Sequence, residues 1–390
     1  MGRAARNPGD DGVAGRSAER ARDVAGDHSA SAPGSDHDPA ARRTAEDRTV
    51  AEGVAREFGL GPVTGIERER HGLMHVTWHV RTAAGGYSLQ ALHPSLAGKG
   101  ALEDHVAVSA HLAARDFPAP RLVPAPDGST ALRYGGEVWR TTTWLAGRPG
   151  ARLAAPSEAC RAARLLGDFH RATADFDPPL RGGVRLHDPA AHAARLRETL
   201  RRAADDPALA RWHAAVSEPS ARALAALERL ALPAGLPERV IHGDPKFSNF
   251  VFDADGRAVG LVDLDGCTRA SVLYDLGDAV RSWSDAGAQA GPARLREDVV
   301  EALLEGWVAA GVGLSAAERE ELPRAGALVA WELAARFLRD VLEDVYFAWD
   351  PTRWSGRREQ NLVRAAAAGD FAAQLETAVP RLRERLAHIR

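Results

Sequence analysis

A nine-residue run, 241–249, carries side chains that suit the transfer of a phosphoryl group. It reads I-H-G-D-P-K-F-S-N, in which Asp244 is followed by Lys246 and Asn249, and Asp263 comes shortly afterwards. In phosphoryl transfer, one aspartate accepts the proton of the attacking hydroxyl, while an asparagine and a second aspartate hold the magnesium that bridges the phosphates. The spacing therefore predicts Asp244 as the general base and Asn249 with Asp263 as metal ligands.

A hairpin is expected directly behind this run. Segments 250–252 and 258–262 have the apolar character of strands, and the turn residues D-A-D-G-R at 253–257 separate them. Antiparallel pairing that starts with Asp253 opposite Ala258 would fix the positions of all the residues that follow. The hairpin therefore determines which side chains meet at its open end.

At that open end Asn249 would lie opposite Val262, which makes Asp263 its neighbour, because paired strands lie about 5 Å apart. A hard cation with oxygen ligands at about 2.1 Å can bridge two such side chains. Alternatively, Asp244 and Asn249 are turn residues and Asp263 ends a strand. The combined spacing favours the metal site over these separate structural roles.

Composition narrows the class of protein. The chain has 390 residues, 45% of them hydrophobic, and a net charge of −3, so it can build large cores and gives no electrostatic support for nucleic-acid binding. Cys160 and Cys267 lie far apart and form neither a disulfide framework nor a zinc pattern. With no long apolar run and no apolar signal core, we expect a cytoplasmic protein without a membrane partner.

The elements divide into a tail and two lobes. Residues 1–46 lack hydrophobic periodicity and aromatic side chains, which predicts a disordered tail. Residues 47–146 form a small lobe with the nucleotide-binding sheet, and we expect helices at 48–60 and 102–115 and strands at 63–70, 74–82, 87–92, 130–134 and 137–145. Residues 147–390 form a large helical lobe that carries the catalytic loop and the acceptor site, with helices near 157–172, 190–204, 207–231, 274–281, 294–311, 315–348 and 357–388. This order predicts an α+β, protein-kinase-like bilobal fold.

The loop H-G-D-P-K-F-S-N, with V-D-L-D behind it, resembles the aminoglycoside phosphotransferase and choline kinase superfamily, which has a protein-kinase-like fold. Between about residues 60 and 380, further stretches are similar to the branch that contains N-acetylhexosamine 1-kinase: G-L-M-H-V-T, Y-S-L-Q, V-W-R, Y-D-L-G-D-A-V-R, R-F-L-R-D, Y-F and N-L-V-R-A. The resemblance implies ATP and Mg²⁺ as cofactors, with Asp244 as base and Asn249 and Asp263 as magnesium ligands. It also implies that His242 braces the loop and that Lys246 offsets charge on the transferring phosphate.

The nucleotide-binding candidates are Gly72, Gln90 and Glu103. The turn at Gly72 would lie over the phosphates, although an ordinary tight turn is the alternative, since this is not G-x-G-x-x-G. Gln90 stands where the resemblance leads us to expect a phosphate-binding lysine, and glutamine can donate a hydrogen bond but carries no charge. Glu103, on the small-lobe helix, either orients Gln90 or is a solvated helix residue.

Three more residues have open roles. Asp265 either binds a second metal ion or ties its loop to backbone amides. Asp278 and Arg281, three residues apart, either form a surface ion pair or hold hydroxyls of the acceptor. The loop also departs from the sugar-kinase branch, because H-G-D-P replaces its usual H-N-D, and this bears on the identity of the acceptor.

The predicted activity is an ATP- and magnesium-dependent kinase for a small hydroxylated metabolite. A sugar or amino sugar is the expected acceptor, and an anomeric hydroxyl is one candidate position. A second hypothesis is that the protein phosphorylates an antibiotic. A third hypothesis is that it is a nucleotide-binding regulator without catalytic activity. Gln90 is the only support for the third reading, and the intact set of Asp244, Asn249 and Asp263 argues against it.

Overall fold

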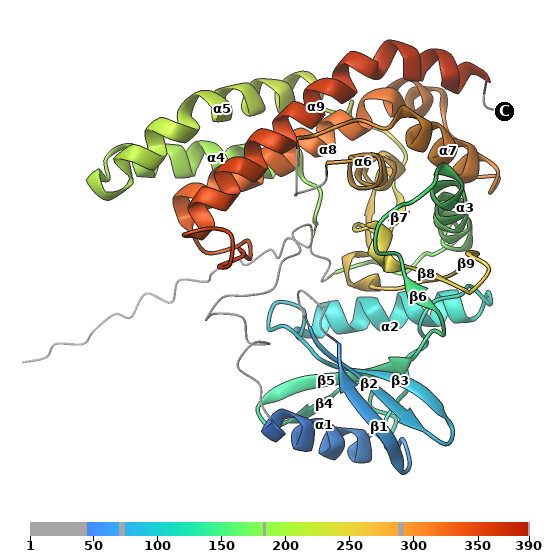
Figure 1. Ribbon diagram of the computed structural model, residues 1–390. Coiled ribbons are helices and arrows are strands. Elements are labelled where there is room, and N and C mark those ends of the chain that lie inside the picture. The colour runs from blue at the N-terminus through green and yellow to red at the C-terminus, as the bar shows by residue number, and fades with distance from the viewer. Residues whose placement is uncertain (1–44, 70–74, 182–184, 288–291, 389–390) are drawn as a thin grey trace, which may run out of the picture.

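The computed structural model describes residues 45–69, 75–181, 185–287 and 292–388, and these form a small lobe rich in strands and a large helical lobe (Figure 1). The small lobe holds a five-stranded antiparallel sheet in the order β1-β2-β3-β5-β4. Its elements are α1 (Ala45–Glu57), β1 (Val63–Arg68), β2 (Val76–Thr82), β3 (Gly85–Ala91), α2 (Lys99–Ala113), β4 (Leu132–Tyr134) and β5 (Glu137–Thr143). The predicted tail up to residue 44, and Gly72, lie outside the described residues.

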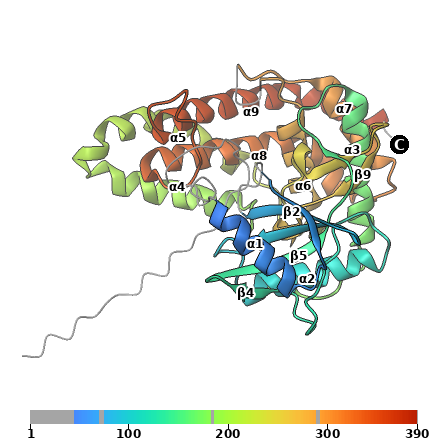
Figure 2. The same cartoon turned by 60° about the horizontal axis from the view of Figure 1, so that its bottom comes forward.

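The two faces of this sheet differ in character. On one face, Val76, Trp78 and Val80 of β2 join α1 in an apolar cluster, as their alternation along the strand requires. Figure 2 shows α1 lying across the strands. The opposite face carries a polar row, because Thr77 pairs with Gln90 and Gln90 with Arg140 across β2, β3 and β5. This polar face is turned toward α2 and the large lobe (Figure 1).

Helix α2 belongs to the small lobe in sequence but packs with the large lobe. Its buried residues Val108 and Leu112 join the large lobe's hydrophobic cluster and not the cluster beneath α1. Asp104 accepts two hydrogen bonds from the backbone N–H of Arg181, both at 2.9 Å, and His111 Nε2 lies 3.0 Å from the carbonyl of Ala172. Helix α2 thus links the sheet to the helices.

The large lobe surrounds the short strands with helices. These elements are β6 (Arg148–Pro149), α3 (Pro156–Ala172), α4 (Pro189–Ala204), η1 (Pro207–Leu209), α5 (Ala210–Arg229), β7 (Arg239–Ile241), η2 (Phe247–Asn249), β8 (Phe250–Phe252), β9 (Ala258–Leu261), η3 (Leu264–Gly266), β10 (Thr268–Ala270), α6 (Val272–Trp283), α7 (Glu297–Val308), α8 (Ala316–Glu343) and α9 (Arg357–His388). Strand β8 pairs with both β6 and β9, and β7 pairs with β10. Asp188 caps α4, because its carboxylate accepts from Ala191 N at 2.9 Å.

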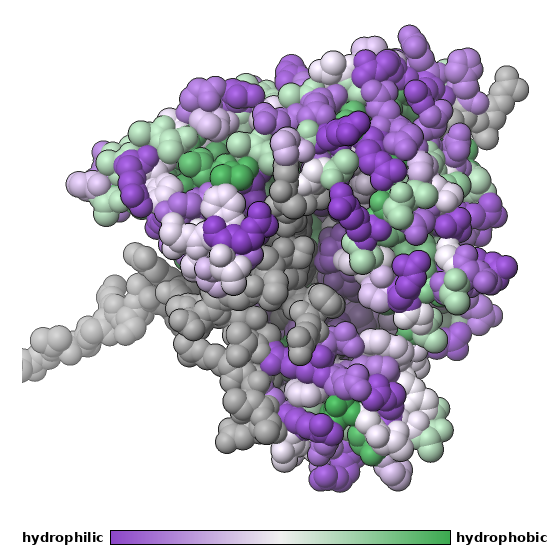
Figure 3. All heavy atoms as spheres, in the orientation of Figure 1, coloured by the Kyte–Doolittle hydropathy of each residue, from purple (hydrophilic) through white to green (hydrophobic). Residues whose placement is uncertain are grey.

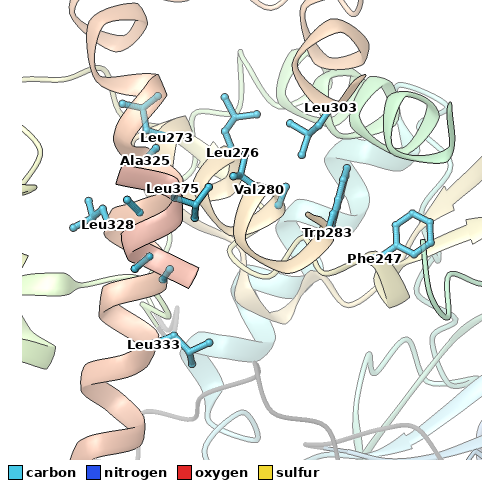
Figure 4. Close-up of a cluster of buried hydrophobic side chains, with 14 of the residues drawn as sticks. Phe247, Leu273, Leu276, Val280, Trp283, Leu303, Ala325, Leu328, Leu333 and Leu375 are labelled. Carbon is cyan, nitrogen blue, oxygen red and sulfur yellow. The ribbon is translucent and has the colours of Figure 1, made fainter. Parts of the chain in front are cut away.

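Helix α6 is the packing centre that anchors the site. Leu276 and Val280 belong to a hydrophobic cluster that includes residues of the long helices α8 and α9, among them Leu375 of α9 (Figure 4). At its end Trp283 meets Phe247 of the catalytic loop edge to face, with ring centroids 5.9 Å apart. Such aromatic contacts add to the burial of apolar area. The loop is therefore held by the apolar core of the large lobe.

On the face shown in Figure 3, hydrophilic residues predominate and the apolar ones form small groups among them. None of the helices that the structure describes combines the length and the apolar character needed to cross a membrane.

Candidate active site

The catalytic loop is held from behind by a buried carboxylate. Asp275 accepts the backbone N–H groups of His242 at 2.7 Å and Gly243 at 2.8 Å. Trp307 Nε1 donates to His170 Nδ1 at 2.9 Å, so the His170 proton is on Nε2, which donates to Asp275 at 2.8 Å. Burial would raise the pKa of Asp275, but the contacts with His170 and His242 together outweigh burial and lower that pKa. The loop backbone is thus fixed before any substrate binds.

His242 braces the loop with its side chain. Its Nε2 donates to the carbonyl of Val262 at 2.9 Å, and its Nδ1 accepts the backbone N–H of Asp244 at 3.3 Å. From the other side Trp283 Nε1 donates to the carbonyl of Pro245 at 2.8 Å. The contacts of His242 agree with the bracing role implied by the resemblance, and they connect the catalytic loop to the strand that leads to Asp263.

Gly243 allows the catalytic and metal-side loops to approach closely. Its φ is +82°, and an added Cβ would lie 2.3 Å from the carbonyl oxygen of Gly266. Any other residue would need both a left-handed backbone and displacement of that carbonyl.

Replacing Gly243 with alanine is therefore expected to destabilise the protein by about 2–4 kcal/mol, from backbone strain plus overpacking. Gly235 is the matched control, since its φ is +83° but nothing lies within 4 Å of its added Cβ. Gly235→Ala should cost only the strain, about 1–2 kcal/mol. Denaturant unfolding of both variants measures the difference, and equal losses would show that the contact with Gly266 does not matter.

The candidate base forms a buried ion pair. Asp244 is 4% exposed, and Lys246 Nζ lies 2.5 Å from its Oδ2 and 3.6 Å from Asp263 Oδ2. Burial disfavours the charge of Lys246, but the carboxylates of Asp244 and Asp263 outweigh burial and raise the pKa of Lys246 above its ordinary value. Lys246 is therefore a fixed cation between the candidate base and a candidate metal ligand.

The two candidate metal ligands are brought together by the hairpin. Val262 N donates to the carbonyl of Asn249 at 2.9 Å, so Asp263 directly follows the residue paired with Asn249. The Asn249 Nδ2 donates to the Asp244 carbonyl at 2.8 Å, which leaves the amide oxygen as the atom suited to a cation. The Asp263 side chain is 33% exposed. An amide oxygen and a carboxylate fit Mg²⁺, which commonly uses one or two protein carboxylates with waters and substrate phosphates.

This hairpin differs from the predicted one only near its turn. Phe250 pairs with Leu261, as the expected register requires, but Phe252 pairs with Ala258 across an irregularity. Asp253 is therefore not the partner of Ala258, because one extra residue is accommodated as a β-bulge. The bulge lies away from Asn249 and leaves the open end in the predicted register. Within the described residues, no group of three or more His, Cys, Asp or Glu side chains could hold a metal ion.

Asp265 has partners that neither sequence interpretation included. Its side chain is 5% exposed and accepts from Arg140 twice, at 2.6 and 2.5 Å. His75 Nε2 lies 3.0 Å from it and His105 Nδ1 lies 3.2 Å away. The carboxylate is thus engaged by side chains of the small lobe and α2, and its role at a second metal ion stays a prediction.

Gln90 is also held by unexpected partners. Its Oε1 accepts from Arg140 Nε at 2.9 Å, and its Nε2 lies 3.4 Å from Thr77 Oγ1. Glu103 is exposed, whereas the next residues along α2, Asp104 and His105, are buried. The exposure of Glu103 agrees with the alternative, a solvated helix residue, and its role in orienting Gln90 stays a prediction.

Asp278 and Arg281 do pair, but not at the surface. Arg281 donates to Asp278 Oδ1 at 3.0 and 2.5 Å, and Asp278 is 2% exposed. The second oxygen, Oδ2, is buried and has no hydrogen-bond partner among the described residues. The charge of Asp278 also contributes to the raised pKa of Lys246, which places this carboxylate near the loop. A surface ion pair is thus the wrong description.

Sequence reasoning gave no site role to two structural features. Arg140 and His75 lie in the stretches V-W-R and G-L-M-H-V-T that carry the resemblance, but their types alone do not point to Asp265. The chain from Trp307 through His170 to Asp275 joins three helices. Helical periodicity can place His170 on a buried face, but it does not identify a partner.

Comparisons with known proteins agree with this architecture. The model of the phosphotransferase enzyme family (APH) matches residues 66–311, which include the loop, the hairpin and α6. An aminoglycoside phosphotransferase from Alicyclobacillus acidocaldarius is 19% identical, with 81% of this chain and 92% of that chain covered and a TM-score of 0.54.

Two further structures share the fold. A microcompartment-associated aminopropanol kinase is 16% identical over 87% of this chain and 100% of its own, with a TM-score of 0.57. Amicoumacin kinase hAmiN, solved with AMP-PNP and Ca²⁺, is 13% identical over 85% and 93%, with a TM-score of 0.59. Because the family model matches more than half of the chain, the protein belongs to the phosphotransferase enzyme family, and the solved structures share its fold.

Proposed function

We propose that the protein is an ATP- and Mg²⁺-dependent kinase that phosphorylates a hydroxyl of a sugar or amino sugar. The observation that carries this proposal is the convergence of Asp244, Lys246, Asn249 and Asp263 on one loop and one hairpin. In this arrangement a base, a fixed cation and two oxygen ligands stand where a phosphoryl group passes from nucleotide to acceptor.

The residues divide the reaction between them. Asp244 accepts a hydrogen bond from the acceptor hydroxyl and takes its proton as the oxygen bonds to the terminal phosphorus. The bond from that phosphorus to the bridging oxygen breaks, and ADP leaves. Asn249 and Asp263 would hold Mg²⁺, which would supply charge neutralisation at the phosphates. Lys246 adds a positive charge beside the reacting groups.

Positioning contributes as much as charge. The loop backbone is already fixed through Asp275 and His242, so the base needs little reorganisation when substrates bind. Holding two reactants in the productive geometry lowers the activation free energy, because their translational and rotational freedom is already lost when they bind. The rigid loop is therefore part of the proposed catalytic machinery.

A buried carboxylate near the loop suits a hydroxylated acceptor. Arg281 donates to Asp278 through Oδ1 alone. The second oxygen, Oδ2, is buried without a hydrogen-bond partner among the described residues, and a substrate hydroxyl would satisfy it. This buried acceptor supports a hydroxylated substrate.

An acceptor panel tests the proposal. We expect magnesium-dependent ADP release and a phosphorylated product with at least one amino sugar or neutral sugar, and not with choline or aminoglycosides. Mass spectrometry of the products, with ³¹P NMR to place the phosphate, is the measurement. Phosphorylation of an aminoglycoside alone would replace the sugar assignment, and a protein that leaves every alcohol in a broad panel unmodified would contradict the proposal.

A further inference from the structure

We propose that Arg140 and Asp265 form an inter-lobe link that positions Asp263 for metal binding, with Arg140 supplying the small-lobe cation that Gln90 cannot. We call the two residues the 140–265 link. Both are positioning residues in this inference, which rests on the proposed function because it concerns the metal of that reaction.

The geometry of the link is that of a strong, directional ion pair. Arg140 donates from Nη1 to Asp265 Oδ1 at 2.6 Å and from Nη2 to Oδ2 at 2.5 Å. Both side chains are nearly inaccessible to water, with 4% and 5% exposed. A planar, two-bonded guanidinium–carboxylate pair fixes orientation as well as distance. The link therefore constrains how the metal-side loop sits against the sheet.

Two histidines complete the surroundings of Asp265. The backbone N–H of His93 donates to His75 Nδ1 at 3.1 Å, so the His75 proton is on Nε2 and is donated to Asp265 Oδ2 at 3.0 Å. His105 Nδ1 of α2 lies 3.2 Å from Oδ1 of Asp265. The pKa of His105 is lowered, mainly by burial and to a smaller extent by the charge of Arg140. The carboxylate is thus tied to the small lobe and to α2 by three side chains.

The link acts on Asp263 through a strained backbone. Asp263 has φ +68° and ψ +61°, in the left-handed region that non-glycine residues avoid. Such a conformation persists only where neighbouring contacts impose it. His242 holds the carbonyl of Val262 on one side, and Asp265, two residues beyond Asp263, is held by Arg140 on the other. Releasing Asp265 removes one of these two restraints.

The position of Arg140 explains why Gln90 is tolerated. Between residues 47 and 146 the only lysine is Lys99, so the polar face of the sheet has no lysine beside Gln90. Arg140 is the cross-strand partner of Gln90 and donates to its Oε1 at 2.9 Å. A cation thus reaches this face from β5 instead of β3.

The test compares Arg140→Met, Asp265→Asn and the double variant for metal binding and turnover. We expect each single variant to weaken Mn²⁺ binding in the presence of ADP by about tenfold or more, as is typical when the partner of a metal-site group is lost. The double variant should lose no more than the single ones, because all three break the same link. Binding is read by electron paramagnetic resonance of free Mn²⁺. The magnesium concentration for half-maximal turnover should rise similarly, with a smaller change in kcat at saturating magnesium.

Controls separate positioning from general destabilisation. Arg239→Met breaks a pair with Glu318, 2.9 Å apart, in which the Arg239 side chain is 20% exposed and that of Glu318 is 0% exposed, and it should lower thermal stability without changing Mn²⁺ affinity. Arg140→Lys keeps the charge but not the two-bonded geometry and should recover part of the affinity. Folded Arg140→Met and Asp265→Asn proteins with wild-type Mn²⁺ affinity would overturn the inference. A wild-type protein without metal-dependent nucleotide binding would instead overturn the proposed function.

Discussion

Asp244→Asn is expected to lower turnover by about two to four orders of magnitude, the range that a positioned general base contributes. Asparagine has the same shape and can still accept a hydrogen bond, but it cannot take the proton of the acceptor hydroxyl. The loop should keep its conformation, because its backbone is fixed by Asp275 and His242 and not by the Asp244 carboxylate. Steady-state kinetics with the acceptor found in the panel measure the loss of kcat.

Nucleotide binding distinguishes a chemical defect from a folding defect in this variant. Calorimetric titration with a non-hydrolysable ATP analogue should give an affinity within a few fold of wild type. Ser248→Ala is the matched control, since Ser248 is an exposed residue of the same loop and takes no part in the proposed chemistry. An Asp244→Asn enzyme with near-normal turnover would exclude Asp244 as the base.

Asp263→Asn is expected to reduce activity at least a hundredfold and to raise the magnesium concentration that the enzyme needs. The carboxylate supplies the negative charge of the proposed metal site, and an amide in its place binds a hard cation far less strongly. The substitution suits the backbone, because asparagine tolerates the left-handed conformation found at this position better than most residues. The loss is therefore assigned to metal binding and not to refolding of the loop.

A second left-handed aspartate provides the control for that variant. Asp116 has φ +50° and pairs with Arg121 on the surface, away from the site. Asp116→Asn makes the same chemical change under the same backbone demand and should leave activity and metal dependence unchanged. Magnesium titrations of both variants, with Mn²⁺ binding followed directly, make the comparison. If Asp263→Asn bound metal like wild type, Asp263 would not be a ligand.

Local sequence determined a large part of this protein. The fold class followed from the order of strand and helix patterns, since alternation and helical periodicity are properties of neighbouring residues. Asn249 lies beside Asp263 because antiparallel pairing propagates from the turn, and even the unforeseen bulge near Asp253 left that end in place. The residue types in the catalytic run and their spacing also predicted the chemistry that they suit.

Tertiary structure alone decided which distant groups complete the site. Arg140 and Asp265 are 125 residues apart, and His170 and Asp275 are 105 apart. Asp278 proved to be buried, and Glu103 proved to be exposed. Periodicity tells which face of an element is buried but not which element will cover it. Partners at such separations are chosen by how whole lobes pack, and a charged side chain becomes buried only when that packing brings its counter-charge within reach.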